Sequence, residues 1–362
     1  MNRYKEILII SVVSFFIIFL SSHFFDYASF NNTEIAETAK VIEITSVEES
    51  DYGSTIVFDA KLTSGDMKNE IVSVTQQIDS YYGYNSKEVI EDDKIIITSY
   101  DNETFAYVCH NRIGTIVFLL FIFIALIFAI AKFKGIPTLL SLVITICTIF
   151  FVYIAGILNG FNVYLLTILV ITFIILTNLT LLNGFNKKTL GAIVGNILGI
   201  TIAGIVAIIF NHLFRLTGIL DQDYIYLTLL EGVSIDLVGI IWGGLLIAAL
   251  GAIMDVSMSL SSSLYELSKE KDATFKKLVT SGMTIGRDII GTMINTLILA
   301  YVGSSLAIIL LFTAYSKNIL IIFNLEMIIV EITQSVVGSI GILLSVPATV
   351  IFCAYLYTKK DV

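Results

Sequence analysis

Charged residues are scarce in this chain of 362 residues: Asp, Glu, Lys and Arg make up only 14%, against 56% hydrophobic residues. A soluble protein of this length cannot bury so much apolar surface in one core, whereas a lipid bilayer solvates it. Proline is also rare, with two residues, which leaves long helices uninterrupted. The three cysteines supply no disulfide framework. The composition therefore excludes an ordinary soluble protein and predicts one that spans a membrane.

Catalytic and nucleotide-binding motifs are missing as well. The sequence contains no Walker loop, zinc-binding helix motif, nucleophile elbow or Gly-rich dinucleotide turn. We therefore predict neither an enzyme nor an ATP-driven pump, and no cofactor; an intramembrane enzyme is a distant alternative that lacks a nucleophile with a base. His23, Cys109, His110 and His212 fall at predicted outer span ends. They would suit a soft metal if those ends converge, but interfacial packing explains them as well, so no metal is predicted.

Long apolar runs predict about eight transmembrane helices. They cover residues 7–25, 113–131, 136–156, 163–182, 189–212, 236–258, 286–313 and 327–357. Each is close to or above the 20 residues that cross a bilayer. The first lacks a small-x-small cleavage site at its exit, so we expect an anchor. The predicted fold is an all-α polytopic membrane protein, with an anchor at 1–25, a small β domain at 26–110 and seven helices at 111–362.

Basic residues gather on one side of these spans. That side holds Arg3, Lys5, Lys132, Lys134, Lys187, Lys188, Lys269, Lys271, Lys276, Lys277, Lys359 and Lys360, and the short opposite loops hold Arg112, Arg215 and Lys317. Positively charged loops stay in the cytoplasm. We therefore predict a multi-pass protein of the cytoplasmic membrane, with both termini cytoplasmic and residues 26–110 extracytoplasmic.

Residues 26–110 differ from the rest of the chain in their hydropathy pattern, because apolar residues alternate there with polar ones. Strands are predicted at about 40–47, 55–62, 70–76, 93–99 and 104–109, with a hairpin turn at Ser64-Gly65-Asp66. Five short strands fit an OB-like barrel or a plain meander. The segment carries 17 acidic and five basic residues. This charge keeps an exterior domain soluble or recruits cations, and it argues against nucleic-acid binding.

Ionisable residues interrupt the apolar runs of the C-terminal half. Polar side chains share helical faces in three places: Asp255, Ser259 and Glu266; Asp288, Thr292 and Asn295; and Glu331 with Gln334. Arg287 adjoins Asp288 but points about 100° away from it. A charge at membrane depth costs roughly 2.5–3.5 kcal/mol on insertion scales, so it persists mainly where it is paired or faces a polar cavity. Asp255 is the expected partner of Arg287, because both are predicted near the inner ends of consecutive spans.

Two interpretations of these residues stay open. In the first, they form static bonds that fix the packing of helices. In the second, they line a path in which the acids bind or relay cations or protons, Arg287 balances charge, and Glu266 lies at the cytoplasmic gate. Ser, Thr, Asn and Gln on the same faces exceed what packing needs, which favours the path.

Three ordered blocks carry a family resemblance. Residues 251–266, residues 286–297 and the segment from Glu331 to Pro347 resemble the signature blocks of the YibE/F family of multi-spanning membrane proteins. Gln334 stands where that pattern commonly has a basic residue. The resemblance covers most of the chain. It implies a cytoplasmic-membrane protein with a permease role, often encoded beside a shorter paralogue, and it supplies no substrate.

The predicted function is that of a secondary transporter or permease for a small solute or cation. The expected partners are the lipid bilayer, the transported solute and either a shorter YibE/F paralogue or further copies of the chain. The alternative is a non-transporting scaffold in which the exterior β domain recruits a partner and the helices anchor it. The two differ in whether the buried carboxylates matter more than the exterior domain.

Overall fold

The computed structural model describes residues 3–24, 35–50, 53–79, 87–99, 104–230, 232–270, 272–315 and 318–359. The chain forms two compact units. Residues 27–133 make up the barrel unit, and residues 1–26 with 134–362 make up the helical unit.

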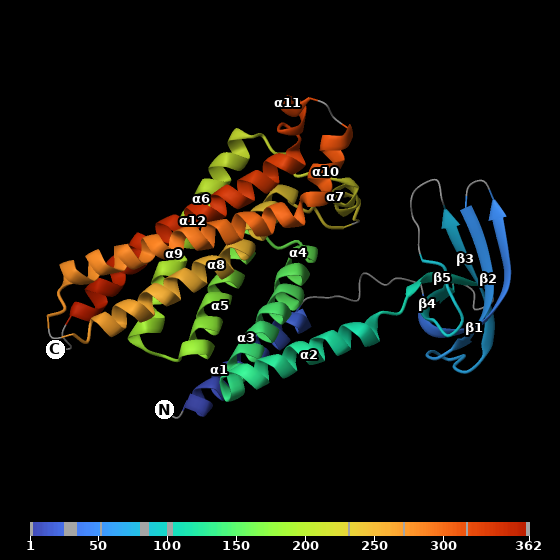
Figure 1. Cartoon of the computed structure of the whole chain (residues 1–362), viewed down its shortest axis with the longest axis horizontal. Helices are drawn as coiled ribbons and strands as arrows, with labels where there is room; N and C mark the ends of the chain where they lie inside the picture. The colour runs from blue at the N-terminus through green and yellow to red at the C-terminus, as the bar shows by residue number, and fades with distance from the viewer. Residues whose placement is uncertain are drawn as a thin grey trace. The chain divides into compact units, whose positions relative to one another are not determined.

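In its described residues, the barrel unit contains five strands followed by one helix (Figure 1). The strands are β1 (Ile35–Ser50), β2 (Gly53–Leu62), β3 (Ile71–Asp79), β4 (Lys94–Ser99) and β5 (Phe105–His110). They close into a barrel in the order β1-β2-β3-β5-β4, with β1 antiparallel to both β2 and β4, and β3 parallel to β5. A meander would keep consecutive strands adjacent, so the barrel alternative is confirmed and the meander is wrong.

The alternation predicted for the second strand defines the barrel core. Ile56, Phe58, Ala60 and Leu62 of β2 are at most 2% exposed, because successive side chains of a strand point to opposite faces. The predicted turn between β2 and β3 is also present. Gly65 adopts φ +82 there, a conformation that side chains other than glycine disfavour.

Helix α2 (Ile113–Ala131) follows the barrel and has the bounds predicted for the second span. None of its residues is buried within the barrel unit. Its last turn ends at Lys132, whose φ of 52° breaks the helical geometry. A 3₁₀ turn, Lys132–Lys134, then leads to the helical unit.

The helical unit begins with α1 (Arg3–Phe24) and continues after residue 134. Its elements are α3 (Gly135–Thr148), a π-helical stretch (Ile149–Ile154), α4 (Ala155–Leu158), α5 (Val163–Asn183), α6 (Lys187–Leu213), α7 (Gln222–Thr228), α8 (Leu237–Leu267), α9 (Phe275–Ser304), α10 (Leu306–Tyr315), α11 (Ile319–Ile322) and α12 (Glu326–Thr358). In the described chain, six helical stretches are long and apolar enough to cross a membrane. Residues Ile113–Leu158 count among them as one stretch of 46 residues, so the predicted number of eight is not confirmed.

The predicted span at 286–313 is wrong in its bounds. Thr274 caps the helix, its side chain accepting a hydrogen bond from the Lys277 amide, so α9 starts at Phe275, well before Gly286. The helix ends at Ser304 because the small residues Gly303, Ser304 and Ser305 favour helix continuation poorly. Arg287 and Asp288 therefore lie near the middle of a 30-residue helix and not at its start.

Close packing of α6, α8 and α12 forms the centre of the helical unit. Gly191, Gly195 and Gly199 of α6 recur at every fourth position and bring the helix backbone against its neighbours. A Cβ atom at Gly195 would lie 1.9 Å from Thr349 Oγ1 of α12, and one at Gly199 would lie 2.7 Å from the Ser345 Cβ. Small residues allow such approach of helices in membranes, where dispersion contacts and hydrogen bonds replace the hydrophobic effect.

Hydrogen bonds hold one end of this unit together. The hydroxyl of Ser261 donates to the Lys188 carbonyl at 2.6 Å and lies 2.6 Å from the Tyr357 hydroxyl. Arg3 donates to the Leu181 carbonyl at 2.6 Å. The first helix, the α5–α6 connection and the last turns of α8 and α12 therefore meet at one end, which we call the lysine end. The N-terminal end of α1 and the C-terminal end of α12 therefore both lie at the lysine end.

A carboxylate organises the opposite end. Glu326, the first residue of α12, accepts hydrogen bonds from the amides of Thr217 and Gly218 at 2.7 and 2.6 Å, and from the Thr217 hydroxyl at 2.9 Å. It fastens the loop after α6 to the start of α12. The sequence analysis did not single out this residue.

Candidate functional site

The structure separates the predicted site residues into three places. Glu266 lies at the lysine end. Most of the others lie on outward faces of two helices: Asp255, Ser259, Arg287, Asp288, Thr292 and Asn295. Glu331 lies toward the opposite end and lines a cavity. No single path collects all of them in the helical unit as described.

Glu266 belongs to an exposed cluster of charges. Its carboxylate accepts hydrogen bonds from Lys188 at 2.8 Å and from Lys269 at 2.7 Å. Both lysine ammonium groups also lie over the ring of Tyr265, at 4.7 and 5.0 Å from its centroid. Hydrogen bonding to Glu266 raises the pKa of Lys269. This arrangement joins the α5–α6 connection to the end of α8, so packing explains it without a gate.

Asp255 and Arg287 do not form the predicted pair. Within the described chain, no ion pair joins either of them to another residue, and both side chains are exposed. The expectation was wrong in two respects, the position of both residues along their helices and the direction of their side chains. Both residues lie 12 positions from the helix ends that the α8–α9 loop joins, about 18 Å at 1.5 Å per residue. Their side chains, however, point away from the packed interior.

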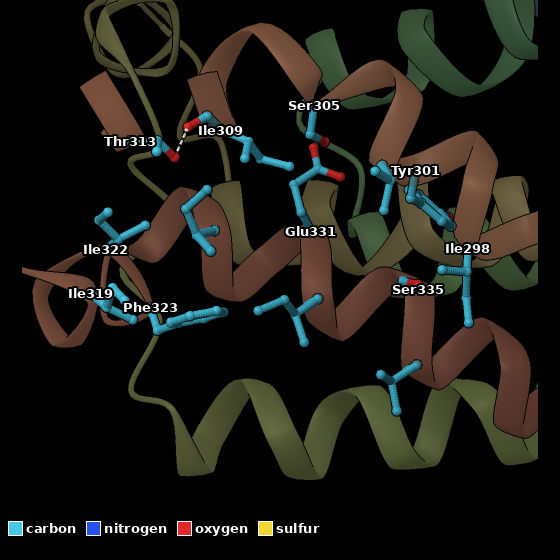
Figure 2. Close-up of a pocket in the computed structure, with 14 residues that line it drawn as sticks. Ile298, Tyr301, Ser305, Ile309, Thr313, Ile319, Ile322, Phe323, Glu331 and Ser335 are labelled. Carbon is cyan, nitrogen blue, oxygen red and sulfur yellow. Dashed lines mark hydrogen bonds between the residues drawn. The ribbon is translucent and has the colours of Figure 1, made fainter. Parts of the chain in front are cut away.

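A cavity of about 810 Å³ lies among α9, α10, α11 and α12. Most of its lining is aliphatic or aromatic, with Ile298, Ile309, Ile328 and Phe323 among the residues that form its walls (Figure 2). The short helix α10 contributes to one wall. At ten residues it is too short to cross a bilayer, and it is a separate helix because α9 ends at Ser304.

Three polar atoms in this cavity have no hydrogen-bond partner. They are Glu331 Oε2, Tyr301 Oη and Ser305 Oγ, each of them inaccessible to solvent. Figure 2 shows the carboxylate of Glu331 and the hydroxyl of Ser305 pointing toward one another. Most buried polar atoms in proteins are hydrogen-bonded, and leaving one unsatisfied costs roughly 1–3 kcal/mol. The three residues that carry these atoms line one largely apolar cavity, which makes it the candidate site of the helical unit.

The negative charge of Glu331 also reaches a neighbouring helix. Burial raises the pKa of Tyr224 in α7, and the carboxylates of Asp221 and Glu331 raise it further. The described residues place no lysine or arginine within ion-pair distance of Glu331. Gln334, one turn along α12, is half-buried and does not line the cavity. The cavity therefore presents one unpaired acid.

Sequence reasoning identified Glu331 but missed Tyr301 and Ser305. Both were inside a segment that hydropathy assigned to one continuous span. The signal was present in the run Tyr301-Val302-Gly303-Ser304-Ser305, where three small residues interrupt an apolar stretch. Such a run favours a helix break, and a break inside a membrane is tolerated only where it is buried in protein or lines a cavity.

The metal hypothesis gains no support. Among the described residues, no group of three or more His, Cys, Asp and Glu side chains could hold a metal ion. His110 lies 2.5 Å from the Tyr107 hydroxyl and 3.3 Å from Asp93, so the barrel already occupies both ring nitrogens. His212 is in the helical unit, at the end of α6. The side chain of His23 lies outside the described residues.

The fold and the cavity define a class: a multi-pass membrane protein whose small β barrel follows the first helix in the chain and precedes the other helices of the helical unit. The chain belongs to the YibE/F-like protein family, which matches residues 119–359. That range spans α9 to α12 and therefore includes the whole cavity. No curated protein and no solved structure matches the chain.

Proposed function

We propose that this protein is a secondary transporter whose substrate site is the Glu331 cavity, and that the substrate is a small organic cation with an apolar body. The observation that carries the proposal is the set of three unsatisfied polar atoms in an otherwise apolar cavity. A protonated amine has N–H donors for Glu331, Tyr301 and Ser305, and its hydrocarbon part suits the isoleucine and phenylalanine walls.

A proton is the natural competitor of such a cation. The carboxyl group of Glu331 can carry a proton or pair with a cation, but it cannot do both at once, because the protonated form has no charge to offer. For an ammonium group to pair with it, a protonated Glu331 carboxyl group must first release its proton. Binding of one cation thus displaces one proton, which is the chemistry that a cation–proton exchanger needs.

We also propose eight membrane crossings. The stretch from Ile113 to Leu158 would be about 69 Å long as one helix, more than twice the 30 Å of a hydrocarbon core. Its break at Lys132–Lys134 suits a turn at a membrane surface. Helix α1 has 22 residues and adds a further crossing. The lysine end then lies in the cytoplasm, and the Glu331 cavity opens nearer the exterior.

Cysteine labelling tests this topology. On a background in which the native cysteines are replaced, a membrane-impermeant maleimide added to intact cells is expected to modify Lys68→Cys in the β2–β3 turn. It should spare Lys134→Cys and Lys276→Cys until the membrane is permeabilised. Labelling of Lys134→Cys in intact cells would contradict two crossings between Ile113 and Leu158. Labelling of Lys276→Cys in intact cells would reverse the orientation.

Transport itself is tested with a matched pair of probes in proteoliposomes. Uptake of radiolabelled 2-phenylethylammonium into vesicles with an acidic lumen should exceed the passive trapping of this weak base in protein-free vesicles. 2-Phenylethanol, which has the same apolar body without the charge, should enter vesicles with and without protein equally. Potassium ions tested in the same vesicles separate an organic-cation site from a general cation path. Equal uptake of all probes with and without protein would favour the scaffold alternative.

A further inference from the structure

Helix α9 presents a charged face that no other described residue of the helical unit covers. Only Leu278, Gly282, Gly286 and Leu297 of its 30 residues are buried. The exposed residues that we call the α9 polar face are Thr284, Arg287, Asp288, Gly291, Thr292 and Asn295. Arg287 and Asp288 lie about 18 Å from the start of the helix, which is near the middle of a 30 Å hydrocarbon layer.

These two charges have no partner within the described residues. Neither side chain takes part in an ion pair or a hydrogen bond there. They cannot satisfy one another well, because adjacent residues of a helix point about 100° apart. Helix α2 is apolar throughout its length from Ile116 to Ala131, so it offers no group that could pair with them. Lipid tails offer none either.

We propose that a second copy of this chain docks on the α9 polar face, with Arg287 of each copy paired with Asp288 of the other. Two copies inserted in the same membrane carry their α9 helices in the same direction, so Arg287 of one lies at the depth of Asp288 of the other. A two-fold axis along the membrane normal forms both pairs at once, as a self-complementary surface requires. The opposite signs at one depth are what favour a second copy over an unlike partner.

Local geometry suits this contact. A Cβ atom at Gly291 would meet nothing within 4 Å, so the backbone there is open to a neighbouring helix. The hydroxyls of Thr284 and Thr292 donate to carbonyls of their own helix, at 3.0 and 2.9 Å, and need no outside acceptor. Arg287, Asp288 and Asn295 therefore remain as the groups that the second copy would satisfy. This inference does not depend on the proposed transport function.

Charge complementation between two tagged copies tests the pairing. In Arg287→Glu both positions are acidic, and in Asp288→Arg both are basic, so each variant should lose self-association at least tenfold in co-purification from detergent. Co-expressed with differently tagged Asp288→Arg, the Arg287→Glu variant should recover association, because both cross-pairs are then of opposite sign. Failure of this mixed pair to associate, while wild-type copies associate, would overturn the Arg287–Asp288 pairing.

Cross-linking of a chain that keeps Arg287 and Asp288 tests the contact even if the charge variants do not fold. On the background without native cysteines, Thr292→Cys should form a cross-linked dimer in native membranes with a short bifunctional maleimide. Ile205→Cys, on an exposed part of α6, is the control and should not. If neither the Thr292→Cys variant nor the Ile205→Cys variant forms a cross-linked dimer, a second copy does not occupy this face. A cross-link of Thr292→Cys only to a different protein would overturn the proposal in the same way.

Discussion

Replacement of Gly195 by valine is expected to remove most of the folded protein from detergent extracts. The first side-chain atom alone would lie 1.9 Å from Thr349 Oγ1, and Ser257 Oγ of α8 is only 3.3 Å away. Three helices meet there, so relief requires α6 to move away from α12 or α8. Overpacking of a close-packed core costs about 3 kcal/mol at the upper end of the usual range. The thermal midpoint and the monodisperse fraction in size-exclusion chromatography report the loss.

Two further variants show whether this loss arises at the contact. Gly114→Val makes the same change in α2, at a glycine whose Cβ would meet nothing within 4 Å, and it should leave the midpoint nearly unchanged. Gly195→Ala combined with Thr349→Ala should be more stable than Gly195→Ala alone, because the nearest clashing atom is then gone. If Gly195→Val unfolds at the wild-type temperature, then α6 and α12 are not in contact at this position.

The prediction of the helices from sequence succeeded where the signal is local. The bounds of α2, α5 and α12 agree with the predicted spans to within about a residue, because uninterrupted apolar runs and their polar ends define such helices. The barrel strands followed from alternation for the same reason. The order of strands did not, because the parallel pairing of β3 with β5 depends on contacts between distant residues.

The site was harder to predict because the sequence of one helix does not show which side of that helix packs against its neighbours. The stripes of Asp255 with Ser259 and of Asp288 with Thr292 were located correctly on their helices. Periodicity predicts that such residues lie together, but it does not distinguish a face turned into the bundle from one turned outward. The structure turns both outward.

Prediction of the cavity would have required contacts between residues that are distant in the sequence. Glu331 attracted attention as a charge in an apolar run, yet its neighbours Tyr301 and Ser305 come from another helix and from a helix break. Hydropathy averages over such a break, since α10 is as apolar as the end of α9. Only the tertiary structure shows that α9 ends at Ser304 and that the residues carrying three unpaired polar atoms line one cavity.

Replacement of Glu331 by glutamine is expected to weaken cation binding strongly and to abolish proton coupling while the protein stays folded. Glutamine keeps nearly the same shape but carries no charge and does not titrate. Hydrogen bonds to charged groups contribute about 1.5–3 kcal/mol, so the affinity for 2-phenylethylammonium should fall about 10- to 100-fold. In the wild type, that affinity should fall with decreasing pH, because a proton on the carboxyl group removes the charge that the cation needs. In Glu331→Gln, the residual affinity should not change with pH.

Stability separates this function from a packing role of the same carboxylate. Glu331 Oε2 has no partner to lose, so removal of the charge should leave the thermal midpoint unchanged or raise it. Glu331→Asp retains the charge on a shorter side chain, and it should bind more weakly while keeping the pH dependence. Asp223→Asn removes an exposed acid of the nearby helix α7 and controls for the general loss of negative charge. The Glu331→Gln substitution removes one charge and changes nothing else in the chain. If this variant binds and takes up the cation with wild-type affinity and pH dependence, Glu331 is therefore not the cation site.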